Sequence, residues 1–264
     1  ALAICLLALL LSLGSRALGE EVVEVWRGGG FAVPDSVSVN PTDGSCWVGD
    51  TGHRQVVHLA EDGAELWRGG EARIWEGRHV SVSVSPADDS CWFAYTTVRY
   101  MAYGGEVIHL SGNGTELWAG GYPGPWALSI NATDGSCWVA VYANYAPGYA
   151  VHLAPDGAEL WRGGEQIKPQ TVSVNPTDGS CWVAGGDLVH LAEDGAELWR
   201  SGDFDDIASL SVNPTDGSCW IADMGSDEIV HLREDGTELW RGGNFNRPGS
   251  VSVNPTDGSC WVAD

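Results

Sequence analysis

The chain repeats the segment Val37-Ser-Val-Asn-Pro-Thr-Asp-Gly-Ser-Cys-Trp-Val-Gly-Asp50, and this repetition predicts its fold. Its Cys-Trp pair occurs six times, and a nearly verbatim copy of the stretch stands at Val251–Asp264. Successive pairs are 45, 46, 44, 38 and 41 residues apart. A period of roughly 40–45 residues is typical of propeller blades. The pairs begin at Cys46, Cys91, Cys137, Cys181, Cys219 and Cys260.

A second motif, Glu-(Leu/Val)-Trp, recurs with the same period. Together the two motifs account for 12 of the 14 Trp residues, so the high Trp content of the chain follows from the number of repeats. The second motif ends at Trp26, Trp67, Trp118, Trp161, Trp199 and Trp240.

One repeat predicts four short strands. Strand a is Val37–Asn40 and strand b is Ser45–Val48, joined by a Pro-Thr-Asp-Gly turn. Strand c is Gln55–Leu59 and strand d is Ala64–Trp67, joined by a Glu-Asp-Gly turn. Asp-Gly between β-rich runs is a strong hairpin signal, and no segment shows a useful helical period. The repeats therefore predict an all-β chain of four-stranded antiparallel blades, a six-bladed β-propeller.

The ring is expected to close by pairing of its N- and C-terminal strands, with the last blade incomplete. Because strand c of that blade is missing, we expect the natural chain to continue past Asp264. The predicted boundaries are a signal peptide at 1–19 and a propeller at 20–264, with blade 6 strand d at 21–26, blade 1 at 31–67, blade 2 at 79–118, blade 3 at 126–161, blade 4 at 170–199, blade 5 at 207–240 and blade 6 strands a and b at 248–264.

The N-terminal residues and the net charge bear on location and partners. Ala1–Leu13 is an apolar run of signal-peptide length, and Ala17-Leu18-Gly19 resembles a cleavage site. The run is too short to span a bilayer, so we expect no membrane insertion after its removal. The 264 residues carry a net charge of −23, which argues against nucleic acid as a partner. We expect an acidic, monomeric protein that is extracellular, periplasmic or in the cell envelope.

The motif order resembles NHL-repeat propellers. The resemblance lies in Pro34–Asn40, Asp43-Gly44, Cys46–Gly52, Val56-Val57 and Asp62-Gly63, and it extends over nearly all of the chain after the leader. It implies a six-bladed fold. It implies little about activity, because the family mixes interaction modules with a few lyases and lactonase-like relatives.

Comparison of the repeats separates two faces of the predicted propeller. The a–b turn has a constant length, and the distance from the strand-c His to the strand-d Trp is always 9 residues. The distance from the strand-b Cys to the strand-c His instead runs 12, 18, 15, 9 and 12. All length variation thus falls on the face of the b–c and d–a loops, and such loops commonly carry binding sites. We call it the variable face and the other the constant face.

The constant face is predicted to be acidic through its turn residues, with Arg233 as its only basic residue. Of the 13 basic residues, 11 are predicted on loops of the variable face. These are Arg27, Arg54, Arg68, Arg73, Arg78, Arg99, Arg162, Lys168, Arg200, Arg241 and Arg247.

Aromatic residues single out blades 2 and 3 of the variable face. All seven Tyr are predicted on their loops, with the two Trp outside the repeat motifs and with His79 interleaved among them. Aromatic faces with Arg partners suit a protein, a peptide or a glycan. The alternative is that long loops need aromatics only to pack onto the scaffold. The candidate ligand-binding residues are Trp75, Arg78, Arg99, Tyr100, Tyr103, Trp126, Tyr142 and Tyr145.

The repeated Cys and His residues favour structural roles. Equivalent positions in neighbouring blades should lie beyond disulfide reach, so the six Cys are interpreted as buried small hydrophobes. Five His hold one position of strand c: His58, His109, His152, His190 and His231.

A metal site is the alternative weighed for the channel mouth. Asp50, Asp223 and Asp264 end strand b in three adjacent blades, and carboxylates suit hard cations. In NHL-like repeats this Asp more often braces its own loop.

The leading hypothesis is an exported binding module without a cofactor or catalytic residue. The alternative is a lyase or lactonase-like hydrolase with a divalent metal at Asp50, Asp223 and Asp264, and His53 as acid or base. A further alternative is a cell-envelope repeat protein with no dedicated ligand.

Overall fold

A computed structural model describes residues 28, 30–70, 77–99, 102–143, 148–164 and 168–264. The predicted strand d at 21–26, and with it the predicted pairing of the terminal strands, lies outside the described residues. Among those residues there is no helix, and so none that could cross a membrane.

Twenty-two strands form five four-stranded antiparallel sheets and one two-stranded sheet within the described part of the chain. Blade 1 contains β1 (Pro34–Val39), β2 (Cys46–Asp50), β3 (Gln55–Leu59) and β4 (Glu65–Gly69). Blade 2 contains β5 (Gly77–Val84), β6 (Cys91–Arg99), β7 (Ala102–Leu110) and β8 (Glu116–Gly121). Blade 3 contains β9 (Pro125–Ile130), β10 (Cys137–Val141), β11 (Tyr149–Leu153) and β12 (Glu159–Gly163). Blade 4 contains β13 (Thr171–Val174), β14 (Cys181–Ala184), β15 (Leu188–Leu191) and β16 (Glu197–Ser201). Blade 5 contains β17 (Ile207–Val212), β18 (Cys219–Asp223), β19 (Glu228–Leu232) and β20 (Glu238–Gly243), and the two-stranded sheet contains β21 (Ser250–Val253) and β22 (Cys260–Ala263).

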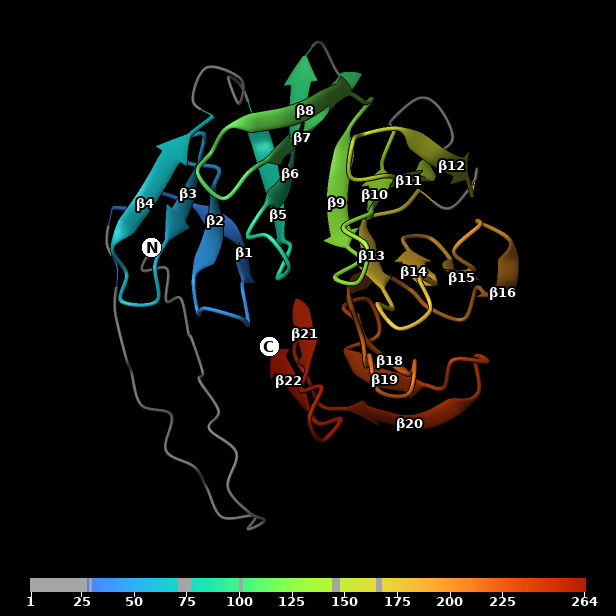
Figure 1. The fold of residues 1–264 in the computed structure, drawn as a ribbon. Helices are drawn as coiled ribbons and strands as arrows, with labels where there is room; N and C mark the ends of the chain where they lie inside the picture. Colours follow the sequence, from blue (N-terminus) through green and yellow to red (C-terminus); the bar gives the residue numbers. More distant parts are fainter. Residues whose placement is uncertain (1–27, 29, 71–76, 100–101, 144–147, 165–167) are drawn as a thin grey trace.

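The sheets are arranged radially, as in a β-propeller. In Figure 1, β1, β5, β9, β13 and β21 surround the centre, whereas β4, β8, β12, β16 and β20 lie at the periphery. Along the chain, each innermost strand contacts the innermost strand of the next sheet, from β1 through β5, β9, β13 and β17 to β21. The predicted all-β propeller architecture is confirmed.

The peripheral strands extend further than the sequence predicts. They continue two or three residues past the Trp, so four Arg residues predicted on variable-face loops lie within strands instead. That prediction was wrong because the strand pairing continues to these residues, as where Arg68 pairs with Val57. Each Arg also forms an ion pair with the Glu three positions earlier on its own strand. The pairs are Glu65–Arg68, Glu159–Arg162, Glu197–Arg200 and Glu238–Arg241, with N–O distances of 2.5–3.0 Å.

The Ser-Val alternation of the innermost strands joins neighbouring blades. The backbone N–H of Val82 donates to Ser36 Oγ, and that of Val84 donates to Ser38 Oγ, both at 3.0 Å. These amides lie on the sheet edge, where no further strand of the blade could accept from them. The same bond recurs at 2.9–3.4 Å from Leu128, Ile130, Val174, Val212, Val251 and Val253.

The Pro-Thr-Asp-Gly turns make a second set of links between blades. Thr42 Oγ1 donates to the carbonyl oxygen of Pro86 at 3.0 Å, and Pro86 is the counterpart of Pro41 in the next blade. Within the turn, Asp43 accepts from the Ser45 N–H, and Gly44 has a φ of +75° that favours glycine. Thr133, Thr177 and Thr215 repeat the contact with Pro176, Pro214 and Pro255 at 2.5–3.0 Å.

The Trp of strand b and the His of strand c form a stack inside each blade. The Trp138 ring is fully buried and lies 4.4 Å from the His152 ring at an interplanar angle of 8°. His152 Nδ1 lies 3.2 Å from the Glu193 carbonyl oxygen of the next blade, and Nε2 lies 2.9 Å from Ser136 Oγ. The Glu193 carbonyl oxygen can only accept, so Nδ1 donates to it, and in the neutral imidazole Nε2 then accepts from the Ser136 hydroxyl. His109 makes the same two kinds of contact.

The Trp of strand d lies over the next blade. A Cβ on Gly157 would approach the Trp118 indole to 2.2 Å, so only glycine leaves room for the ring. The same relation joins Trp67 to Gly114 and Trp161 to Gly195. The repeated Trp and the repeated turn glycine are therefore two halves of one inter-blade contact.

The six described cysteines form no disulfide. Five are buried and Cys260 is half-buried. Burial raises the pKa of the Cys137 and Cys219 thiols, as expected for apolar surroundings.

The first prediction concerns two histidines at one repeat position. His152→Phe should lower the free energy of unfolding by about 2 kcal/mol more than His190→Phe, because it leaves Ser136 Oγ and the Glu193 carbonyl without their partner. Neither ring nitrogen of His190 has a partner in the described residues. Urea unfolding of both variants at pH 7.5 measures the difference. Equal losses would contradict the roles assigned to these bonds.

The second prediction is a loss of stability in mild acid. Burial lowers the pKa of His109, His152, His190 and His231 below the ordinary value of about 6.5. As the pH falls below about 6.5, the unfolded chain binds protons that the folded chain does not, so stability decreases until the folded pKa values are passed. Urea midpoints should fall between pH 7.5 and pH 5. A constant midpoint over this range would refute the assignment.

Candidate functional site

Four aromatic side chains meet on the variable face of blades 2 and 3. The His79 ring is stacked on the Trp126 ring at 5.2 Å and 18°. Tyr103 meets Trp126 edge-on at 6.0 Å and Tyr142 edge-on at 5.6 Å. Trp126 and Tyr142 lie 5.9 Å apart. We refer to these four residues as the aromatic cluster, and all four are half-buried.

The fold places the cluster at the ends of strands from two blades. His79 lies in β5 and Trp126 in β9, which are adjacent innermost strands. Tyr103 lies near the start of β7, and Tyr142 directly follows β10. All four positions belong to strand ends on the side of the variable loops.

Gly124 lets the two tyrosines approach each other. It has a φ of +81° and accepts the Tyr142 N–H on its carbonyl oxygen at 2.8 Å. A Cβ there would lie 2.3 Å from the Tyr142 carbonyl oxygen and 2.9 Å from Tyr103 Cβ. Any larger residue would push the cluster apart. Nothing in the sequence distinguishes this glycine from the other 35.

A carboxylate of blade 1 anchors the His79 end of the cluster. Asp35 Oδ2 lies 3.0 Å from His79 Nδ1 and accepts from Thr51 Oγ1 at 2.7 Å and from the Val80 N–H at 3.3 Å. These bonds fix the plane of the imidazole and thereby the stack with Trp126. Asp35 could not be predicted from the sequence, because nothing distinguishes it among 36 acidic residues.

The described structure includes part of the predicted site. It brings together Tyr103, Trp126 and Tyr142, three of the eight candidates, and adds His79. Arg78 lies in β5 and Arg99 in β6. Trp75, Tyr100 and Tyr145 lie outside the described residues.

Three of the other tyrosines pack onto the scaffold, as the alternative interpretation of the loop aromatics predicted. Tyr95 was predicted on a loop, but it is a buried residue of β6 that packs in a core cluster, with its hydroxyl 2.8 Å from Glu106 Oε2. Tyr122 and Tyr149 pack against the core of blades 2 and 3. The Arg162 guanidinium lies 4.8 Å from the centre of the Tyr149 ring. The loop prediction was wrong for Tyr95 and Tyr149, because β6 and β11 include residues assigned to loops, whereas Tyr122 directly follows the end of β8.

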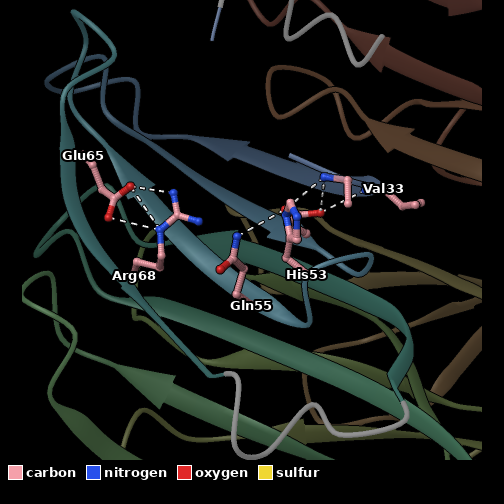
Figure 2. Close-up of polar contacts among 7 residues, drawn as sticks. Val33, His53, Gln55, Glu65 and Arg68 are labelled. Carbon is pink, nitrogen blue, oxygen red and sulfur yellow. Dashed lines mark hydrogen bonds and ion pairs between the residues drawn. The ribbon is translucent and has the colours of Figure 1, made fainter. Parts of the chain in front are cut away.

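Asp50, a candidate metal ligand, is used by its own blade. It is fully buried and accepts from the backbone N–H groups of Ala32 and Val33, from Gln55 Nε2 and from His53 Nδ1 at 2.7 Å (Figure 2). Burial alone would raise its pKa, but these hydrogen bonds outweigh burial and lower it. Figure 2 also shows the Glu65–Arg68 pair on the same blade.

The other two candidate ligands have equivalent roles. Asp223 accepts from the backbone N–H groups of Asp205, Asp206 and Gly225 at 3.0–3.2 Å. Asp264 accepts from the Asn246 N–H. Each of the three carboxylates therefore braces the segment that enters its own blade. In the parts of the chain that the structure describes, no three His, Cys, Asp or Glu residues are placed to hold one metal ion.

The arrangement is suited to binding. Half-buried aromatic faces at an interface contribute apolar area with little loss of conformational entropy, and their edges and faces accommodate sugars, cations or other rings. A rigid scaffold of innermost strands holds the cluster, so a ligand would meet preorganised rings.

The fold and the cluster define a β-propeller with a local aromatic surface, and comparison with known proteins supports the fold. No family model and no curated protein sequence matches this chain. Among solved structures, the chain is similar to a chain of hydrazine synthase from Kuenenia stuttgartiensis, with a TM-score of 0.70, 13% identity and coverage of 88% of this chain and 80% of that chain.

Two further structures are similar at lower scores. A protein of unknown function from Bacteroides caccae matches with a TM-score of 0.58 and 14% identity over 88% of each chain. A chain of a nidogen/laminin complex matches with a TM-score of 0.58 and 10% identity over 80% of this chain and 82% of that chain. At these identities the likeness establishes the fold alone.

Proposed function

We propose that this protein is an exported, NHL-like propeller that acts as a binding module. Its ligand is a protein, a peptide or a glycan, held on the variable face over blades 2 and 3. The observation that carries the proposal is the aromatic cluster, in which Tyr103, Trp126 and Tyr142 converge with His79. The cluster is half-buried rather than buried, so its rings keep area for a partner.

The repeat structure supports this placement. Repeat residues of the innermost strands, the turns and strand c are used in bonds to the next blade. The cluster residues have no counterpart in the other repeats, since neither Trp126 nor Tyr142 belongs to a repeated motif. The nidogen/laminin structure shows a protein of this fold within a protein complex, which is consistent with a macromolecular partner.

The metal-dependent lyase or hydrolase receives less support. Its proposed ligands Asp50, Asp223 and Asp264 accept hydrogen bonds from backbone amides of their own blades. Elemental analysis of the purified protein separates the two functions. A stoichiometric, tightly bound divalent metal would favour the enzyme over the binding module.

The third prediction concerns Trp126 and Tyr142. The Trp126→Ala and Tyr142→Ala variants should each weaken ligand binding at least tenfold, as expected for central aromatic anchors (about 2 kcal/mol or more). Ligands are first selected with the wild-type protein on a glycan microarray and a displayed peptide library, and their affinities are then measured for each variant.

Trp261→Ala provides the control, because this Trp is 58% exposed and lies in β22, outside the cluster. It should leave affinity unchanged, and all variants should keep melting temperatures within a few degrees of the wild type. Binding that survives both cluster variants would contradict the proposal. A collapse in stability of the cluster variants would instead favour the packing alternative.

A further inference from the structure

The junction between blades 4 and 5 departs from the other described junctions. His190 is fully buried, yet neither of its ring nitrogens has a hydrogen-bond partner within the described residues. The equivalent His152 is paired at both nitrogens. Ser180 Oγ, the equivalent of the Ser136 hydroxyl that pairs with His152, also lacks a partner there. A buried, unpaired imidazole costs free energy, so a regular repeat would not retain one without a reason.

Trp199 is oriented differently from its counterparts at this junction. Trp199 meets Trp182 at 4.9 Å and 80°, whereas the corresponding pairs of the other blades lie at 5.6–5.8 Å and 50–55°. Its Nε1 donates to the Glu234 carbonyl oxygen at 2.7 Å. That carbonyl is the equivalent of the oxygen to which His152 bonds. The indole has also moved off the next turn, since a Cβ on Gly236 would lie 3.1 Å from it rather than about 2 Å.

A cavity of about 640 Å³ lies beside the Trp199 ring. His190 lines it, together with Leu198 and Trp199 of β16 and Leu239 of β20. The turns of blade 5 complete the lining with five polar residues, Asp216, Ser218, Arg233, Glu234 and Asp235. The cavity lies on the constant face, away from the aromatic cluster.

A sequence difference accompanies the cavity. Arg233 stands where the other four blades have Ala60, Ser111, Ala154 and Ala192. It is the one large side chain at this position of the turn, and it lines the cavity. The junction is therefore altered in both sequence and geometry.

The lining favours a positively charged, amphiphilic group. Three carboxylates face one guanidinium, and the chain as a whole carries a charge of −23. Leu198 and Leu239 are 52% and 43% exposed and offer an apolar wall to a hydrocarbon stem. Burial lowers the pKa of His190 more than Asp178 and the backbone of Glu234 raise it, so its imidazole is neutral at pH 7 and has one acceptor nitrogen.

We propose that this cavity binds an alkylammonium group, either a free amine or the side chain of a lysine. The ammonium donates to the free nitrogen of His190 and is neutralised by the carboxylates of Asp216 and Asp235, while its methylene stem lies on Leu198 and Leu239. An ammonium has three donors and no acceptor, which matches a site whose unused groups include one acceptor nitrogen and several carboxylate oxygens.

The test titrates the whole protein with n-pentylammonium and follows the imidazole nitrogens of His190 by NMR, assigned with the His190→Phe variant. The proposal predicts a saturable shift of these signals. Pentanol and pentanoate, which have the same stem with a neutral or an anionic head, should bind at least about tenfold more weakly. Pentanoate binding as tightly as pentylammonium, or no shift with pentylammonium, would overturn the proposal.

Matched variants distinguish the site from general attraction to an acidic surface. Asp235→Asn should weaken pentylammonium binding about three- to fivefold, while Asp156→Asn, at the same turn position of blade 3, should leave it unchanged. Equal effects of the two variants would overturn the proposal. His190→Phe should abolish binding while the protein remains folded, and retained binding in this variant would also overturn the proposal.

Nα-acetyl-lysine N-methylamide separates the two sources of the ammonium. If the ammonium comes from a lysine side chain of a partner, this compound should bind at least as tightly as pentylammonium. Exclusion of this compound with retained pentylammonium binding assigns the cavity to a free amine.

Discussion

The structure depends on one contact that crosses from each blade to the next: the indole of a peripheral Trp lying over a turn glycine. Trp118 covers Gly157 so closely that even a Cβ could not be accommodated. Inside the blade, the same Trp packs at 5.7 Å against the buried Trp92, which is stacked on His109. His109 in turn reaches the carbonyl oxygen of Pro155 in the next blade. Aromatic packing and hydrogen bonding therefore act together, and neither blade can shift without breaking both.

This use of the repeat residues separates stability from binding. The Ser hydroxyls of innermost strands, the Thr hydroxyls of the turns and the His rings mostly point to the next blade. Two regions do not follow these repeated contacts between blades. They are the aromatic cluster on the variable face and the altered junction of blades 4 and 5 on the constant face. Both sites depart from the repeated inter-blade contacts, although His79 bonds to Asp35 of blade 1 and Trp199 donates to the Glu234 carbonyl of blade 5.

The sequence predicted the architecture well because its repeat is periodic in both Trp motifs. Cys46-Trp47 and its copies fall in strand b, and strand c at Gln55–Leu59 has the predicted bounds. Predictions on the longer strands were less successful: Tyr95 is a core residue of β6, and Arg68 is paired with Glu65 within β4. Strand ends depend on pairing between distant segments, which a single repeat does not reveal.

The two sites differ in how visible they are in sequence. The concentration of Trp126 and Tyr142 in one sector pointed to the aromatic cluster, but Asp35 and Gly124 act through contacts that only the fold creates. At the altered junction, the exchange of alanine for Arg233 could have been noticed by aligning the repeats. The different orientation of Trp199 and the unpaired nitrogens of His190 could not have been predicted from the sequence. The residues at those positions are the same as in the other blades.

A double-mutant cycle of Trp118→Phe and Gly157→Ala in urea unfolding measures whether the indole–glycine contacts join the blades. Gly157 has a φ of +84°, so alanine is strained there in either background, and the cycle isolates the contact from that strain. The account predicts that Gly157→Ala costs at least about 1 kcal/mol less when Trp118 is replaced. It predicts a smaller coupling for Trp199 and Gly236, where the ring lies further away. An equal cost of Gly157→Ala in both backgrounds would contradict the account.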